Sequence, residues 1–84
     1  MIPKHISDTL LNNKFSMDFE DGCAVYKKYY KTAIFGDIQV DVFDGKGFKP
    51  QINIVKDCED IISHDLTAEN VEMCISEINK IARQ

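Results

Sequence analysis

Two runs of alternating apolar residues, joined by a glycine-rich segment, constrain the fold of this chain most. They extend from Thr32 to Val55 and meet at Asp44-Gly45-Lys46-Gly47. Apolar side chains at every second position are typical of a strand with one buried face, and a short Asp/Gly segment between two such runs is typical of a hairpin turn. We therefore predict a central antiparallel hairpin. Its inward-facing residues are expected to be Ile34, Ile38, Val40, Val42, Ile52 and Ile54.

Two residues interrupt these runs. Gly36 lies where a bulge or a bend is expected, because glycine inside a strand weakens regular pairing. Pro50 has no N–H to donate to a ladder. The strand from Phe48 to Val55 is therefore expected to begin at a sheet edge or to be unpaired in its first half.

A second hairpin is predicted before the central one. Between Lys14 and Glu20 the apolar residues again alternate, which predicts a half-buried strand. Asp21-Gly22 follows and is a favoured dipeptide for a two-residue type I′ turn. The segment from Cys23 to Tyr30 is then expected to return as the second strand of this hairpin.

A two-residue turn sets the register of this hairpin. Phe19 then lies opposite Ala24 on the core face. Met17 lies opposite Tyr26 on the same face. The apolar Val25 is turned outward by this register, a conflict that a longer turn would relieve.

Both ends of the chain are expected to be helical. Pro3 is suited to the first turn of a helix that runs to about Asn12, with Ile6, Leu10 and Leu11 on one stripe. Near the other end, Thr67 is a good N-cap, and Leu66 with Val71 has the spacing of a hydrophobic staple. The apolar stripe of this second helix is expected to contain Val71, Cys74, Ile75, Ile78, Ile81 and Ala82.

The acidic stretch from Lys56 to Leu66 connects the hairpins to the last helix. Ile61-Ile62 is predicted to form a short fifth strand after a turn at Asp57-Cys58-Glu59, with a helical turn as the alternative. The elements together predict one α+β domain over residues 1–84. Two consecutive hairpins form an antiparallel sheet of four to five strands, and the short N-terminal helix and the amphipathic C-terminal helix pack on one face of it.

No pattern of residues identifies a catalytic, cofactor or metal site. The serines lie in no nucleophile motif and neither histidine has the context of a catalytic base, so we expect no enzyme. The spacing of a calcium-binding loop is absent, and Cys58 with His64 supplies only two soft ligands for zinc. Gly45 and Gly47 belong to no phosphate-binding glycine motif. We therefore expect no catalytic residue, no cofactor and no metal.

Charge and cysteine content bear on partners and location. The formal net charge of -4 disfavours binding along a phosphate backbone and is more compatible with a basic partner. Cys23, Cys58 and Cys74 are an odd number without a Cys-x-x-Cys pair, which suits reduced thiols. No run approaches the roughly 18 to 20 apolar residues that span a bilayer. We expect a cytoplasmic protein that does not contact membranes.

Two features predict a contact surface. One is the basic and aromatic cluster Lys27-Lys28-Tyr29-Tyr30-Lys31. The other is the outward face of the central hairpin, which has more aromatic side chains than a solvated face needs. We predict that residues of both features bind a partner on the sheet face away from the helices. These residues are Tyr29, Tyr30, Phe35, Asp37, Gln39, Asp41 and Phe43.

The preferred hypothesis is a small non-enzymatic protein-binding module, an inhibitor or accessory factor that occupies a partner's surface. A more specific form is a counter-defence protein from a phage or other mobile element, of the anti-CRISPR or anti-restriction type. An acidic surface suits the basic groove in which such a partner holds nucleic acid. The alternatives are a nucleic-acid-binding regulator that uses Lys27 to Lys31, and a homodimeric structural protein.

Overall fold

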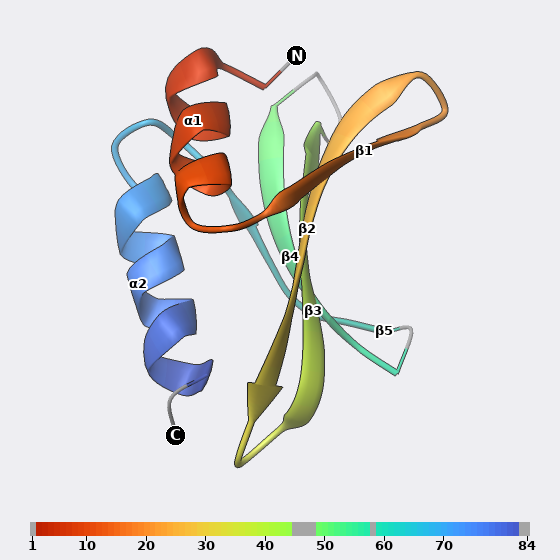
Figure 1. Ribbon diagram of the computed structural model, residues 1–84, viewed down its shortest axis with the longest axis vertical. Coiled ribbons are helices and arrows are strands. Elements are labelled where there is room, and N and C mark those ends of the chain that lie inside the picture. Colours follow the sequence, from red (N-terminus) through yellow and green to blue (C-terminus); the bar gives the residue numbers. More distant parts are fainter. Residues whose placement is uncertain (1, 45–48, 58, 83–84) are drawn as a thin grey trace.

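The computed structural model describes residues 2–44, 49–57 and 59–82, which form one sheet and two helices (Figure 1). The elements are α1 (Lys4–Asn12), β1 (Ser16–Glu20), β2 (Cys23–Thr32), β3 (Gly36–Asp44), β4 (Pro50–Lys56), β5 (Glu59–Asp65) and α2 (Val71–Ala82). The strands pair antiparallel in the order β1-β2-β3-β4-β5, so each strand pairs with its neighbours in sequence. The predicted α+β architecture is confirmed, with five strands. Neither helix is long and apolar enough to cross a bilayer.

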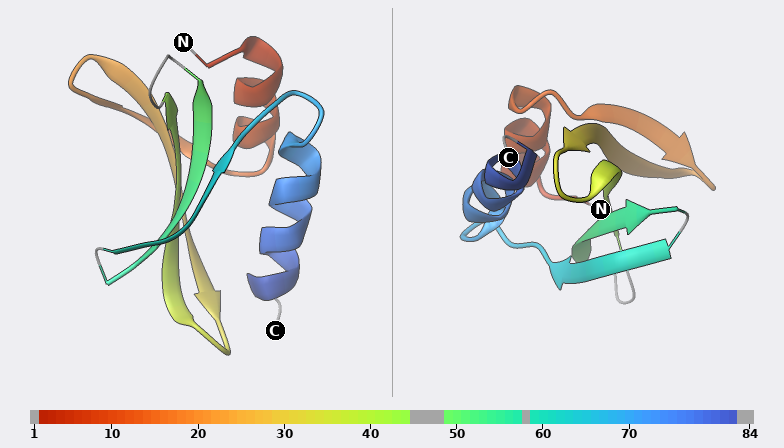
Figure 2. Two further views of the ribbon diagram at one scale, coloured as in Figure 1. Left: turned by 180° about the vertical axis from the view of Figure 1, so that it is seen from behind. Right: turned by 90° about the horizontal axis from the view of Figure 1, so that it is seen from below.

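Both helices lie on the same face of the sheet, as predicted (Figures 1 and 2). Side chains of a strand alternate between the two faces, so every second residue of the central strands points toward the helices. The core fills the space between the helices and this face. Its buried residues are Ile6, Leu10, Phe15, Tyr26, Tyr30, Ile38, Val40, Val42, Ile52, Leu66, Val71, Ile75 and Ile78. On the described part of the chain, the other face of the sheet carries no helix; we call it the open face.

The two helices begin close to where the sequence predicts. α1 begins directly after Pro3, whose carbonyl accepts the N–H of Ser7 at 3.0 Å. Before α2, the N–H of Asn70 donates to Thr67 Oγ1 at 3.2 Å, and the N–H of Thr67 donates to Asn70 Oδ1 at 2.7 Å. This exchange is that of a capping box, with asparagine in the place of the usual Glu or Gln. Leu11 differs from the prediction, because it is exposed beside the buried Leu10.

The β1–β2 hairpin has the predicted turn and register. Asp21 and Gly22 have φ angles of 53° and 80°, the positive values that a type I′ turn requires. Phe19 pairs with Ala24, as expected.

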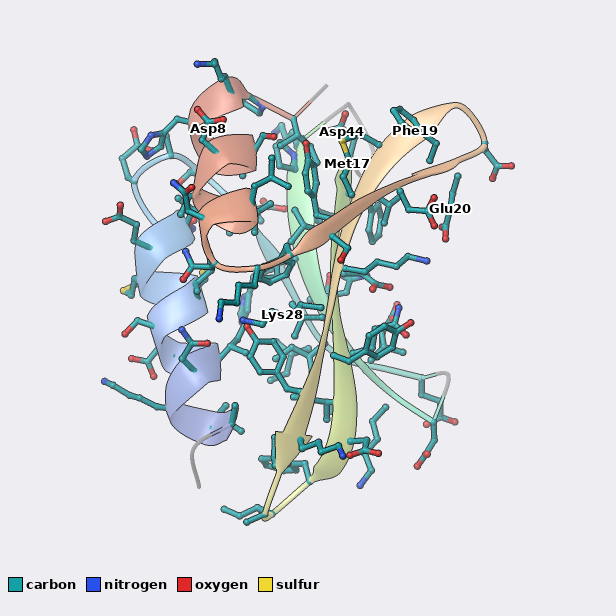
Figure 3. The ribbon with its side chains drawn as sticks, viewed as in Figure 1. Asp8, Met17, Phe19, Glu20, Lys28 and Asp44 are labelled. Carbon is teal, nitrogen blue, oxygen red and sulfur yellow. The ribbon has the colours of Figure 1, made fainter. Side chains whose placement is uncertain are left out.

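The burial expected for the end of β1 is wrong. Met17 pairs with Tyr26 as predicted, yet Met17 and Phe19 are 49% and 66% exposed. The hairpin extends beyond the helix layer, so its tip is not covered by the helices (Figure 3).

The third strand begins later than predicted. Thr32 belongs to β2, and 33–35 forms the turn of a β2–β3 hairpin, so Ile34 is exposed and not part of the core. Thr32 Oγ1 accepts the N–H of Phe35 and donates to the carbonyl of Gly36, both at 2.9 Å. Gly36 pairs with Thr32 and has a φ of 70°. It therefore closes this hairpin, and the bulge expected inside a strand is not found there.

Gly36→Ala is expected to lower the free energy of unfolding by about 1 kcal/mol. An added Cβ meets no atom within 4 Å, so the cost comes only from the left-handed backbone, which disfavours residues with a Cβ by about 1 to 2 kcal/mol. Gly36→Asn is the control, because asparagine tolerates this conformation. Urea unfolding of both variants measures the difference. Equal stability of the alanine and glycine proteins would contradict the positive φ.

The last three strands follow the predicted order, with one correction. β5 confirms the predicted fifth strand, and its ladder with β4 shifts register between Ile54 and Val55. Pro50 does not mark an edge or an unpaired half-strand: it is the first residue of β4, which lies between β3 and β5. Its carbonyl accepts the N–H of Leu66 at 2.9 Å, and proline is tolerated at a first strand position because little pairing is lost. The predicted turn at Gly45-Lys46-Gly47 lies outside the described residues.

Candidate protein-binding surfaces

The inward-facing residues of β2 attach both helices to the sheet. The hydroxyls of Tyr26 and Ser7 share a hydrogen bond of 2.6 Å, which joins β2 to α1. The hydroxyl of Tyr30 donates to Asn79 Oδ1 at 3.3 Å, which joins β2 to α2. Tyr30 is only 7% exposed, and burial raises the pKa of its hydroxyl. The placement of Tyr30 on the partner-binding surface is therefore wrong, because strand alternation turns it to the opposite face from Tyr29.

Lys28 also points toward the helices (Figure 3). Its Nζ donates to the carbonyl of Asn13, just after the end of α1, at 2.8 Å. The same Nζ lies 4.6 Å from the ring centroid of Tyr30 and 5.8 Å from that of Phe15. A cation is stabilised at a helix C-terminus and over aromatic faces, so this lysine has a structural role. Burial, followed by the charge of Lys14, lowers its pKa.

The other two lysines of the basic cluster lie on the open face, each beside a carboxylate. Lys27 is opposite Asp41 and Lys31 is opposite Asp37 in the β2–β3 ladder. Lys27 also donates a hydrogen bond to Glu20, which raises its pKa. The cluster predicted from the sequence is thus divided between the two faces of β2, and each of its outward lysines lies opposite a carboxylate. A phosphate backbone needs excess positive charge, which this arrangement does not provide.

Among the described residues, Tyr29 is the most exposed large apolar or aromatic side chain, at 73%, and it lies opposite Gln39 on the open face. The amide Nε2 of Gln39 donates to Asp41 Oδ1 at 2.6 Å, which orients the carboxylate beside the tyrosine. Phe43 is half-buried further along the same side of β3. We call Tyr29, Asp37, Gln39, Asp41 and Phe43 the open-face patch. These five predicted residues come together on one surface.

Three other residues do not belong to the open-face patch, either because they lie outside the paired strands or because they are buried. Phe35 lies in the turn of the β2–β3 hairpin, outside the paired strands, so it is not part of the open-face patch. Val25 faces outward as the two-residue turn requires, yet it is buried, as is Asn53 on the same face. The sheet curves, so neighbouring strands shield residues in the middle of this face (Figure 2).

A second surface was not predicted from the sequence. It is a groove of about 530 Å³ between α2 and the helix-facing side of β4 and β5. We call it the α2–β5 groove. It is lined mainly by apolar side chains, because α2 leaves part of these two strands uncovered. The lining residues are Ile52, Ile54, Ile62, His64, Asp65, Asn70, Met73, Cys74, Glu77, Ile78 and Ile81.

Two acidic residues and one cysteine thiol lie at this groove. Asp65 and Glu77 lie at the groove, and Glu77 contacts Lys80 at 3.6 Å in an exposed pair. Burial raises the pKa of the Cys74 thiol, which favours the neutral form over the reactive thiolate. The sequence indicates this groove only through the apolar stripe of α2. In addition to the fully buried residues of the helix, this stripe contains Cys74 and Ile81, which line the groove.

Within the described ranges, no three His, Cys, Asp or Glu side chains are grouped so that they could hold a metal ion. Cys58, considered with His64 as a zinc ligand, lies outside those ranges. Comparison with known proteins adds no family: no protein-family model, curated protein or solved structure matches this chain.

Proposed function

We propose that this chain is a non-enzymatic protein-binding module, an inhibitor or accessory factor that acts by covering part of a partner's surface. The observation that carries the proposal is the exposure of Tyr29 at the centre of the open-face patch. Tyrosine surrounded by polar side chains is the composition that protein interfaces favour, and such residues often dominate binding energy. The backbone of Tyr29 belongs to a paired strand, so little backbone ordering entropy is lost on binding.

A more specific form of the proposal concerns the class of partner. The chain has a net charge of -4, and the two lysines on the open face, Lys27 and Lys31, each lie beside a carboxylate, so this face has no excess of positive charge. Such a surface suits a partner with a basic groove, for example a nuclease or surveillance complex inhibited by a mobile element. The split of the lysine cluster favours this class over direct nucleic-acid binding.

Tyr29→Ala is expected to reduce capture of the partner at least tenfold when the tagged protein is used on a lysate of its own cells. Truncation of a central aromatic residue typically costs about 2 kcal/mol or more of binding energy. Leu11→Ala is the control, because Leu11 is also an exposed large apolar residue but lies on α1. Quantitative mass spectrometry of the captured proteins is the measurement.

The proposal fails if every captured protein is retained equally by Tyr29→Ala and the parent chain. It also fails if the purified chain shifts DNA or RNA in a salt-dependent manner, since this would establish nucleic-acid binding. A homodimer formed through the open-face patch, detected by sedimentation and lost in Tyr29→Ala, would assign this surface to a second copy.

A further inference from the structure

We propose that the α2–β5 groove and the free edge of β5 together bind an extended, basic segment of another protein, which adds to the sheet as a sixth strand. This site is separate from the open-face patch. Three observations lead to it: the backbone groups along β5, the apolar lining of the groove, and the charge of the elements around it.

β5 is the last strand of the sheet, so on the described part of the chain only one of its sides has a strand partner. The N–H of Leu66 donates to the carbonyl of Pro50, which identifies one hydrogen-bonded pair between β5 and β4. Such pairs recur at every second residue of an antiparallel ladder. The N–H groups of Ser63 and Asp65 therefore point away from β4, toward the free edge. The carbonyl of Asp65, on the same side, already accepts Asn70 Nδ2 at 3.2 Å, so the carbonyls open to an added strand lie before Asp65.

The groove lies beside this edge. Ile62 and His64 are opposite Ile54 and Ile52, so their side chains lie on the helix-facing side of the sheet, where they line the groove. Every second side chain of an added strand would lie in the same layer, between β5 and α2. Met73, which is exposed on α2, would be covered by it. Strand addition combines backbone hydrogen bonds with pockets for alternate side chains, which a small apolar ligand cannot do.

The charge of the residues around the groove indicates which kind of segment would bind there. Three carboxylates lie on the edge strand, those of Glu59, Asp60 and Asp65, and Glu77 of α2 lines the groove. Glu72 lies on the other side of α2, toward α1, and Lys56 of β4 is opposite Glu59. The described residues of β5 and α2 contain one lysine, Lys80, which already contacts Glu77. A segment with alternating basic and apolar residues is complementary to this site, whereas a second copy of the chain, with net charge -4, is less so.

The test is an NMR titration of the whole protein with the blocked peptide KVKVKVK, in which lysine and valine alternate. The expected result is that hydrogen exchange slows at least fivefold at the amides of Ser63 and Asp65, with shift changes in β5 and α2. The peptide EVEVEVE has the same apolar residues and the opposite charge, and is expected to bind at least tenfold more weakly.

Two variants with the same substitution separate the groove from general surface effects. Ile62→Lys places a charge in the groove and is expected to abolish peptide binding. Ile34→Lys changes another exposed isoleucine, in the β2–β3 turn, and is expected to leave affinity within twofold. Both positions are exposed, so both variants should fold.

Three results would overturn the site. One is no amide change at millimolar peptide, and another is equal binding of the two peptides. The third is protection of Ser63 and Asp65 that rises with protein concentration without peptide, which would assign the edge to a second copy. Tyr29 lies on the other face, so Tyr29→Ala is expected to leave peptide affinity unchanged, and this proposal and the proposed function can fail independently.

Discussion

Phe15→Ala is expected to lower the free energy of unfolding by about 3 to 4 kcal/mol, whereas Phe19→Ala is expected to cost less than about 1 kcal/mol. The two rings lie on the same side of the chain, four residues apart, and the substitution removes the same atoms. Phe15 is only 4% exposed and belongs to the core, while Phe19 lies on the hairpin tip beyond the helices. Truncation of Phe15 therefore leaves a cavity, and truncation of Phe19 removes surface that is already in contact with water.

Urea unfolding of the two variants and the parent measures these costs from the transition midpoints, provided that the slope is unchanged. Similar costs for both substitutions would show that the tip of the β1–β2 hairpin is covered in solution. A large cost for Phe19 alone would show that the helices cover the hairpin tip and leave Phe15 exposed.

This pair of residues also shows what the sequence could predict. Alternation identified the side on which Phe15 and Phe19 lie, because it depends only on local strand geometry. It could not identify which of them is covered, since that depends on where α1 lies over the sheet. The same reason explains Leu11, which lies beside the buried Leu10 but is exposed. The local pattern thus predicts which face of a strand or helix a residue lies on, but it does not predict whether another element covers that residue.

Turns were predicted where the residues had strong conformational preferences. Asp21-Gly22 was recognised because this dipeptide favours two positive φ angles. The turn at 33–35 was missed because its apolar residues continue the pattern of a strand. Its signals were Gly36, which takes the left-handed conformation, and Thr32, whose hydroxyl bridges the turn. Both signals are local, so the sequence contains enough information to predict the turn at 33–35.

The open-face patch and the α2–β5 groove also differ in how far the sequence predicts them. Five residues of the predicted contact surface come together because they follow the alternation of two paired strands. The α2–β5 groove exists because α2 leaves part of the sheet uncovered. The position of α2 over the sheet is determined by the packing of the whole core. No local pattern around Ile62 or Met73 contains that information, although both residues line the groove.

Tyr30→Ala is expected to lower the free energy of unfolding by about 3 to 5 kcal/mol, whereas Tyr29→Ala is expected to change it by less than about 0.5 kcal/mol. Tyr30 is buried between the sheet and α2, and its ring also contacts Lys28 Nζ. Its removal leaves a cavity and deprives the half-buried Lys28 ammonium of the nearer of its two aromatic partners. Tyr29 loses only exposed surface.

Thermal and urea unfolding of the two variants test this difference between neighbouring residues. Tyr30→Phe is the matched control, because it keeps the ring and removes only the 3.3 Å hydrogen bond to Asn79, worth about 1 kcal/mol or less. If Tyr29→Ala is as costly as Tyr30→Ala, the open face is covered in solution and the binding surface proposed on it is wrong. If Tyr29→Ala is neutral, a loss of partner capture in that variant reports on contact alone, since the fold beneath it is intact.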